Sequence, residues 1–221
     1  MLTVCHLSTS RSERIVWLLE ELGLDYRLEW FQRESTGAAP AALREIHALG
    51  KAPVITEDGN TIAESGAIIE YLVERHGNGA LVPPPGTAEK LRYTYWMHFA
   101  EGSLMSLMLI ALVISRIPEA KESPVRKRIH DRLDRTLAFV DDAISKHAYF
   151  AGDEFTAADV MMVFPFTTMR RYLDYDLAPY ANIRGYLERI ESRPAYRKAM
   201  ALSGPDAKEE STRALRAGSA T

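Results

Sequence analysis

The chain has only one cysteine, Cys5, among its 221 residues. A single thiol excludes a framework of internal disulfides and any metal site built from several cysteines. The six histidines are far apart, so the chain lacks the close spacing by which a helix presents two histidines to zinc. The GxGxxG, P-loop and GxSxG motifs are also missing, which removes the usual signatures of dinucleotide binding, nucleotide binding and serine hydrolysis. We therefore expect no metal cofactor.

An excess of positive charge is lacking as well. Lys and Arg total 27 against 30 Asp and Glu, a formal net charge of -3, whereas nucleic-acid binding needs positive groups that neutralise phosphates. The first residues show no basic segment followed by a long apolar run, so no signal peptide is expected. The most apolar segment, residues 104–114, is shorter than the roughly 20 residues that cross a bilayer. The sequence predicts a cytoplasmic protein without a nucleic-acid or membrane partner.

The first eighty residues alternate between strand and helix patterns. Apolar runs and alternating segments predict four strands, at residues 2–7, 26–31, 54–56 and 61–63. Apolar residues at helical spacing predict three helices, at residues 10–22, 41–49 and 65–75. The resulting order, β-α-β-α-β-β-α, is typical of an α/β domain in which helices cover a small mixed sheet.

A proline-rich break at residues 83–86 ends this pattern, and we place the domain boundary there. The segments beyond it have helical patterning, with helices expected at residues 87–117 and 124–146, from residue 156, and at residues 183–192. The predicted organisation is an α/β domain at residues 1–80, a linker at 81–86, an all-α helical bundle at 87–202 and a loose tail at 203–221.

Ser10 and Glu13 have the S-x-x-E spacing of a capping box at the start of the first predicted helix. A capping hydroxyl accepts a backbone N–H yet keeps its own proton to donate. The N-terminal end of a helix also attracts negative charge, so this position suits an anion such as a thiolate. Ser8 and Thr9 could supply the hydroxyl instead, and the sequence does not choose among the three.

Two further segments of the first domain suggest ligand contacts. Pro53 opens a predicted central strand, where it removes a ladder hydrogen bond. A cis peptide at Ala52-Pro53 would expose the backbone of Ala52 to an extended peptide ligand. Glu64 and Ser65 lie at a strand-to-helix junction, where Ser65 is also a plausible N-cap. A hydroxyl beside helix amides can hold a carboxylate while Glu64 holds an ammonium, which fits an amino-acid head group.

The second domain offers two other patterns. Thr156 and Asp159 have the spacing of a capping box that opens an apolar helix, which we interpret as structural. The long predicted helix carries a group of aromatic and methionine side chains: Tyr93, Trp96, Met97 and Met105. Packing in the bundle core or at a dimer contact explains this group. The alternative is a pocket for an apolar electrophile, where pliable methionines adapt to different shapes.

Four segments in order, Ser10–Arg14, Trp17–Leu24, Gly50–Ile55 and Ala63–Ile68, resemble the glutathione transferase family. Phe155–Asp159 resembles the helix-capping segment in the helical half of that family. The resemblance covers residues 1 to about 200, and the first helix is most similar to soluble bacterial members. It implies a thioredoxin-like N-terminal domain, an all-helical C-terminal domain, a homodimer, and glutathione as co-substrate.

The same resemblance assigns roles residue by residue. Glu64 and Ser65 would bind the γ-glutamyl group of glutathione. Ala52, before a cis Pro53, would pair through its backbone with the cysteine of glutathione, and Lys51 would lie near the glycyl end. The long helix of the second domain would carry the second substrate.

The resemblance places the thiol-activating residue at the start of the first helix, where families carry Tyr, Ser or Cys. This loop has no tyrosine, and Cys5 lies too early, inside a predicted strand. A hydroxyl-type enzyme acting through Ser10 or Thr9 is therefore implied. The thiolate of glutathione would then attack an apolar electrophile or an organic hydroperoxide, as in detoxification. The alternatives are a non-catalytic glutathione-binding module of the same fold and a glutathione-dependent lyase, isomerase or dehalogenase.

Overall fold

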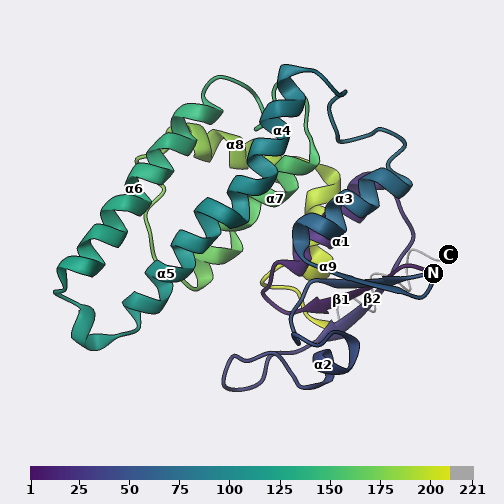
Figure 1. Ribbon diagram of the computed structural model, residues 1–221, viewed down its shortest axis with the longest axis horizontal. Coiled ribbons are helices and arrows are strands. Elements are labelled where there is room, and N and C mark those ends of the chain that lie inside the picture. The colour runs from purple at the N-terminus through teal and green to yellow at the C-terminus, as the bar shows by residue number, and fades with distance from the viewer. Residues whose placement is uncertain (210–221) are drawn as a thin grey trace. The chain divides into compact units, whose positions relative to one another are not determined.

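The computed structural model describes residues 1–209. The described chain forms two compact units (Figure 1). One comprises residues 1–80 together with the described residues from Glu191 onward, and the other comprises residues 81–190. Most of the segment expected as a loose tail, from residue 210 to residue 221, lies outside the described residues.

The first unit is a four-stranded mixed sheet with helices, as predicted. Its strands are β1 (Thr3–Leu7), β2 (Arg27–Phe31), β3 (Val54–Glu57) and β4 (Asn60–Ala63). They lie in the order β2-β1-β3-β4, with β1 parallel to β2 and β3 antiparallel to both of its neighbours. Its helices are α1 (Ser12–Leu22), α2 (Ala42–Ile46), α3 (Ser65–His76) and α9 (Pro194–Ser203).

Helices pack on both faces of this sheet. The side chains of β1 show which helix lies on which face, because successive side chains of a strand point to opposite sides. Cys5 and Leu7 of β1 pack with Val54 of β3 against Leu43 of α2. His6, which alternates with them along β1, lies 2.8 Å from the hydroxyl of Ser12 at the start of α1. Helix α1 also contacts α3. The loops at the ends of the strands are therefore carried by a sheet that is buried on both sides.

Helix α9 belongs to the first unit because it packs on α1. The carboxylate of Glu21 accepts hydrogen bonds from Nε and Nη2 of Arg193, both at 2.7 Å, and from the indole of Trp17 at 2.8 Å. The ring of Trp17 meets the ring of Tyr196 edge-on at 4.9 Å. The domain bounds predicted from the sequence place residues up to 202 in the helical domain, whereas these late residues cluster with residues 1–80. Such pairing across 172 residues has no local signal.

The second unit is helical, as predicted. The long helix expected at residues 87–117 consists of α4 (Ala88–Phe99), a π-helical segment η1 (Ala100–Met105) and α5 (Ser106–Ser115). The remaining elements are η2 (Pro118–Ala120), α6 (Pro124–Ile144), α7 (Ala157–Phe166), η3 (Thr168–Arg171) and α8 (Ala181–Glu191). All residues of α7 are buried, so this helix is central to the unit.

The helix spanning residues 88–115 is long and apolar enough to cross a membrane when judged by length and composition alone. The apolar segment predicted at 104–114, which contains Ser106, is shorter than this helix because the helix also includes polar residues on either side. Within this helix, 44% of the most apolar window is buried in the protein. One face of this helix therefore packs inside the unit, while Leu109, Ile110 and Val113 are exposed on it.

The predicted capping box of Thr156 and Asp159 is present and buried. One carboxylate oxygen of Asp159 accepts the Thr156 N–H at 2.9 Å, and the other accepts the Phe150 N–H at 3.0 Å and the Tyr186 hydroxyl at 3.2 Å. Burial raises the pKa of Asp159 to about 6, while these hydrogen bonds oppose the rise. The carboxylate thus joins the start of α7, the preceding loop and α8.

Replacing this carboxylate should destabilise the protein strongly. In Asp159→Ala the N–H groups of Phe150 and Thr156 stay buried without their acceptor, and we expect a loss of about 3 kcal/mol. The matched control is Asp142→Ala, which removes only an exposed pair with Lys146. Denaturant unfolding of both variants measures the difference. Equal losses of stability in the two variants would show that the buried hydrogen bonds of Asp159 stabilise the protein no more than an exposed ion pair does.

Candidate functional site

Three loops leave the sheet of the first unit from the same end. Cys5 of β1 is paired with Val54 of β3, and Val54 is paired with Ala63 of β4. The carboxyl end of β1, the amino end of β3 and the carboxyl end of β4 are therefore adjacent. The loops at this end contain all the site residues predicted in the first domain: Thr9, Ser10, Lys51, Ala52, Pro53, Glu64 and Ser65.

The loop after β1 is held by an arginine that the sequence analysis missed. Arg33, just after β2, donates from Nε to the carbonyl of Ser8 and from Nη2 to the carbonyl of Thr9, both at 3.1 Å. Thr9 has a φ of 50°, a left-handed conformation that is uncommon without glycine and that clusters at functional sites. Because Arg33 acts across 24 residues, no local pattern identifies it.

Ser10 differs from its predicted capping role. Helix α1 begins at Ser12 with Arg11 as its N-cap residue, so Ser10 precedes the N-cap instead of being it. The carbonyl of Ser10 accepts the N–H of Glu13 at 3.2 Å, in a tight turn before the helix. The hydroxyl of Ser10 accepts the N–H of Ser12 at 3.3 Å. Its oxygen is still held at the N-terminal end of α1.

Ser10 is also the end of a buried polar chain. Its hydroxyl lies 2.7 Å from the hydroxyl of Ser12, which in turn lies 2.8 Å from Nδ1 of His6. His6 is completely buried, and this burial lowers the pKa of its imidazole to about 3. The sequence analysis had considered histidines only as zinc ligands. Neither residue spacing nor periodicity indicates a contact between a strand histidine and a helix serine.

The other two loops provide a backbone segment before Pro53 and the N-terminus of α3. The peptide bond between Ala52 and Pro53 is cis, as predicted, and Lys51 before it is exposed. Glu64, with φ 72°, is the N-cap residue of α3, so Ser65 is the first helical residue rather than the cap. Ser65 is buried and Glu64 is exposed. The N-terminus of α3 therefore provides amides and positive potential for an anion at this end of the sheet.

Cys5 does not belong to this group of loops. Its side chain is buried within β1, and burial, aided by the charge of Glu29, raises the pKa of its thiol to about 11. A thiol of this kind is protonated at neutral pH and unreactive. Within residues 1–209, no three side chains of His, Cys, Asp or Glu are grouped as metal ligands.

The residues predicted for a second-substrate pocket are core residues. None is more than 5% exposed: Tyr93, Trp96, Met97 and Met105. The ring of Trp96 packs against Phe99 at 4.9 Å and against Phe150 at 4.8 Å, all within the second unit. Their helical spacing reflects the inward face of the long helix. Burial favours the packing explanation for these four side chains, and their role in a second-substrate pocket stays a prediction.

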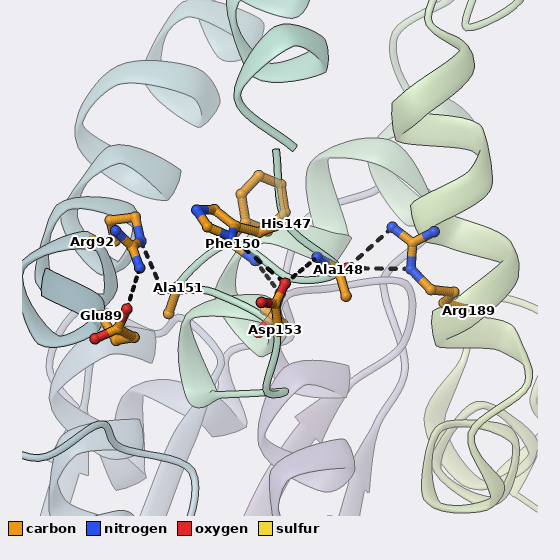
Figure 2. A network of polar contacts seen from close by, with 9 residues as sticks. Glu89, Arg92, His147, Ala148, Phe150, Ala151, Asp153 and Arg189 are labelled. Carbon is orange, nitrogen blue, oxygen red and sulfur yellow. Dashed lines mark hydrogen bonds and ion pairs between the residues drawn. The ribbon is translucent and has the colours of Figure 1, made fainter. Parts of the chain in front are cut away.

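The second unit does have a cavity, of about 500 Å³, beside the linker. Its wall is formed by Leu81–Pro84, Glu89 and residues 151–156. Figure 2 shows how the adjoining loop is fixed: Arg92 donates to the Ala151 carbonyl at 2.8 Å, and Arg189 donates to the Ala148 carbonyl at 3.0 Å. Both bonds go to backbone carbonyls. They hold the loop between α6 and α7 on α4 and α8.

Comparison with known proteins agrees with this arrangement. The protein-family model for the glutathione S-transferase N-terminal domain matches residues 10–75, and the model for the C-terminal domain matches residues 104–194. Glutathione S-transferase 3 of Schizosaccharomyces pombe is 36% identical over 212 residues, which cover 90% of this chain and 86% of that protein.

Solved structures agree as well. The crystal structure of a glutathione S-transferase from Actinobacillus pleuropneumoniae is 34% identical, with a TM-score of 0.85 over 96% of this chain and 99% of that chain. A sphingomonad glutathione S-transferase, solved in complex with glutathione, is 22% identical and has a TM-score of 0.73, over 91% of this chain and 98% of that chain. At that identity the likeness shows a shared fold.

The burial of Cys5 makes a direct prediction about reactivity. In the native protein the thiol should resist a thiol-modifying reagent for hours, while denaturant should expose it for complete modification. Cys5→Ala should keep the kcat of the wild type, because the thiol takes no part in the site. Fast labelling of the native protein, or a large loss of kcat in Cys5→Ala, would contradict this view of the strand.

Proposed function

Because the chain belongs to the glutathione S-transferase family and is a glutathione transferase, we propose that the three loops at one end of its sheet hold glutathione and activate the thiol. The observation that supports this most is the strand pairing that gathers these loops. They bring together a hydroxyl at one helix N-terminus, an extended backbone segment and a second helix N-terminus. These features suit a thiol, a peptide backbone and a carboxylate, the three parts of glutathione.

The proposed donor to the sulfur is the hydroxyl of Ser10, with Thr9 as the alternative. A free thiol with a pKa near 8.5 is about 97% protonated at pH 7. A lowering by about two pKa units needs roughly 2.7 kcal/mol of preferential thiolate stabilisation. A hydrogen bond to a charged group supplies about 1.5–3 kcal/mol and a helix N-terminus about 0.3–1 kcal/mol. Ser10 fits better because its oxygen is already fixed by the N–H of Ser12.

The remainder of glutathione is assigned to the other two loops. The γ-glutamyl carboxylate accepts from Ser65 and from the first amides of α3, while Glu64 holds the ammonium group. The backbone of Ala52 pairs with the cysteinyl residue, and Lys51 faces the glycyl carboxylate. The exposed, left-handed Glu64 supports this role, since such a conformation in a residue other than glycine is kept where a function requires it.

The activated thiolate attacks an apolar electrophile. The C–S bond forms as the leaving group departs with its electron pair. With an organic hydroperoxide, the thiolate sulfur takes the terminal OH group as the O–O bond breaks, which gives the sulfenic acid of glutathione and an alkoxide that takes a proton from water and leaves as the alcohol. A second glutathione then attacks the sulfenic acid, which gives glutathione disulfide and water. A cytoplasmic detoxification role is consistent with this chemistry.

We also propose that the protein is a homodimer joined along the long helix. Large apolar side chains are exposed on this helix, at Leu91, Tyr95, Leu109, Ile110 and Val113, and Ile117 follows just after its end. Phe139 of α6 is exposed too, and its ring lies 5.8 Å from that of Phe99. Contiguous exposed apolar surface is uncommon on monomers. A second copy of the chain covers it with an identical apolar surface, as a twofold dimer does.

Mutation of Ser10 separates its role from that of Thr9. Ser10→Ala should lower kcat by about tenfold to a hundredfold with little change in the KM for glutathione, since the lost bond acts mainly on the developing thiolate. Thr9→Ala should have a much smaller effect on kcat. Steady-state kinetics with a standard aromatic electrophile provides both values. The reverse ranking would transfer the donor role to Thr9.

Mutation of Ser65 should act on binding instead. Ser65→Ala removes a buried hydrogen bond to a carboxylate, and we expect glutathione affinity to fall by about tenfold to a hundredfold with a smaller change in kcat. Thr61→Ala, at an exposed position of β4, is the control. Titration calorimetry with glutathione measures the affinity. An unchanged affinity in Ser65→Ala would remove this residue from the γ-glutamyl site.

The proposed dimer face can be tested by charge. Light scattering should give the wild type twice the 24.8 kDa mass of one chain. Val113→Glu, at a residue 62% exposed, should shift the mass toward that of a monomer, because a buried unpaired carboxylate opposes association. Leu49→Glu, equally exposed in the first unit, should leave the mass unchanged. A wild type that is monomeric at micromolar concentration contradicts the proposal.

A further inference from the structure

We propose that His6 and Ser12 are positioning residues which aim the hydroxyl proton of Ser10 away from the protein interior and toward the sulfur of glutathione. The proposal rests on the proposed function, in which Ser10 is the donor to that sulfur. A hydroxyl carries one proton, and a serine that gives this proton to a neighbour cannot give it to a thiolate. The hydrogen-bond partners of Ser10 therefore decide whether its hydroxyl can donate to the sulfur of glutathione.

The first step concerns the hydrogen bonds of Ser12. Its hydroxyl oxygen has two lone pairs and one proton. One lone pair accepts the N–H of Leu7 at 3.2 Å. His6 Nδ1 at 2.8 Å and the Ser10 hydroxyl at 2.7 Å compete for the other lone pair and for the proton, and the carbonyl of Leu7, at 3.3 Å, is a third and more distant acceptor for that proton. If His6 donates, both lone pairs are occupied, and Ser12 cannot accept from Ser10.

The second step concerns the tautomer of His6. Its Nε2 is buried and has no hydrogen-bond partner among residues 1–209, while Nδ1 faces Ser12. A buried N–H without an acceptor is rarer and more costly than a bare acceptor nitrogen. An Nε2–H would also add a second such donor next to Trp30, whose indole N–H is buried without a partner and whose ring lies edge-on at 4.4 Å. The neutral imidazole, kept uncharged by burial, therefore carries its proton on Nδ1.

These assignments decide which group donates in each hydrogen bond from His6 through Ser12 to Ser10. His6 Nδ1–H donates to Ser12, the proton of Ser12 goes to Ser10 at 2.7 Å, its nearest acceptor, and Ser10 also accepts the N–H of Ser12. Ser10 then has no acceptor among these groups, and its proton is directed away from them. Donors that point at the site before substrate arrives need no reorganisation when the charge develops.

The tautomer of His6 can be measured directly in the wild-type protein. Long-range proton–nitrogen spectra of protein labelled with nitrogen-15 on histidine distinguish a proton on Nδ1 from one on Nε2. The signal that disappears in His6→Asn identifies His6 among the six histidines. We expect the Nδ1–H form. The Nε2–H form would reverse the first hydrogen bond and overturn the proposal.

The functional test uses variants that differ in the donor. His6→Phe keeps a ring but loses Nδ1–H, and the pKa of bound glutathione should rise by about one, with kcat lowered about five- to tenfold and the KM for glutathione nearly unchanged. His6→Asn carries a side-chain N–H in a similar place and should recover most of both losses. Ser12→Ala should behave like His6→Phe and serves as the second test if that variant folds poorly. His130→Phe, a histidine of α6, is the matched control.

Two outcomes would overturn the role of His6 and Ser12 while leaving Ser10 as the donor. In one, Ser10→Ala raises the pKa of the bound thiol, but His6→Phe and Ser12→Ala do not. In the other, His6→Asn is as impaired as His6→Phe, so that a side-chain N–H in this place recovers neither the pKa of the bound thiol nor kcat. If Ser10→Ala itself leaves the pKa of the thiol unchanged, the assignment of Ser10 fails, and the positioning role fails with it.

Discussion

The pairing of β3 with β1 is the constraint on which the site depends. Cys5 and Val54 are neighbours in the sheet, and this antiparallel register places the start of β3 at the end of β1. The next hairpin then returns the chain to the same end at Ala63. A shift of one residue in this register would turn the buried side chains of β3 to the other face. Burial of both faces by α1, α2 and α3 therefore fixes where the loops meet.

Each unit also buries a titratable group, and the two groups are treated differently. Asp159 in the helical unit has hydrogen-bond donors on both carboxylate oxygens, so its burial defines the start of α7 and the loop before it. In the described part of the chain, His6 forms a hydrogen bond through Nδ1 and none through Nε2. The hydrogen bonds of Asp159 explain its burial by a structural role. His6 is buried with one nitrogen unbonded, next to a proposed catalytic serine, and a functional role explains this better.

The sequence predicted the elements better than their partners. Strand and helix positions in the first eighty residues followed from apolar periodicity, and the capping box at Thr156 followed from its spacing, because both signals are local. Arg33, the contact of His6 with Ser12, and the packing of α9 on α1 join residues that are distant along the chain or on different elements. The buried group around Trp96 shows a related limit: helical spacing marks a face, but burial decides whether that face lines a pocket or a core.

Binding of glutathione by this chain should stabilise the thiolate at the start of α1. The most direct test is a pH titration of the ultraviolet absorbance of the thiolate, with glutathione bound to the wild-type protein. The midpoint should lie well below that of free glutathione, by about two pH units. Bound glutathione that titrates at the midpoint of the free tripeptide would contradict it, because binding without a shift means that neither the serine hydroxyl nor the helix terminus acts on the sulfur.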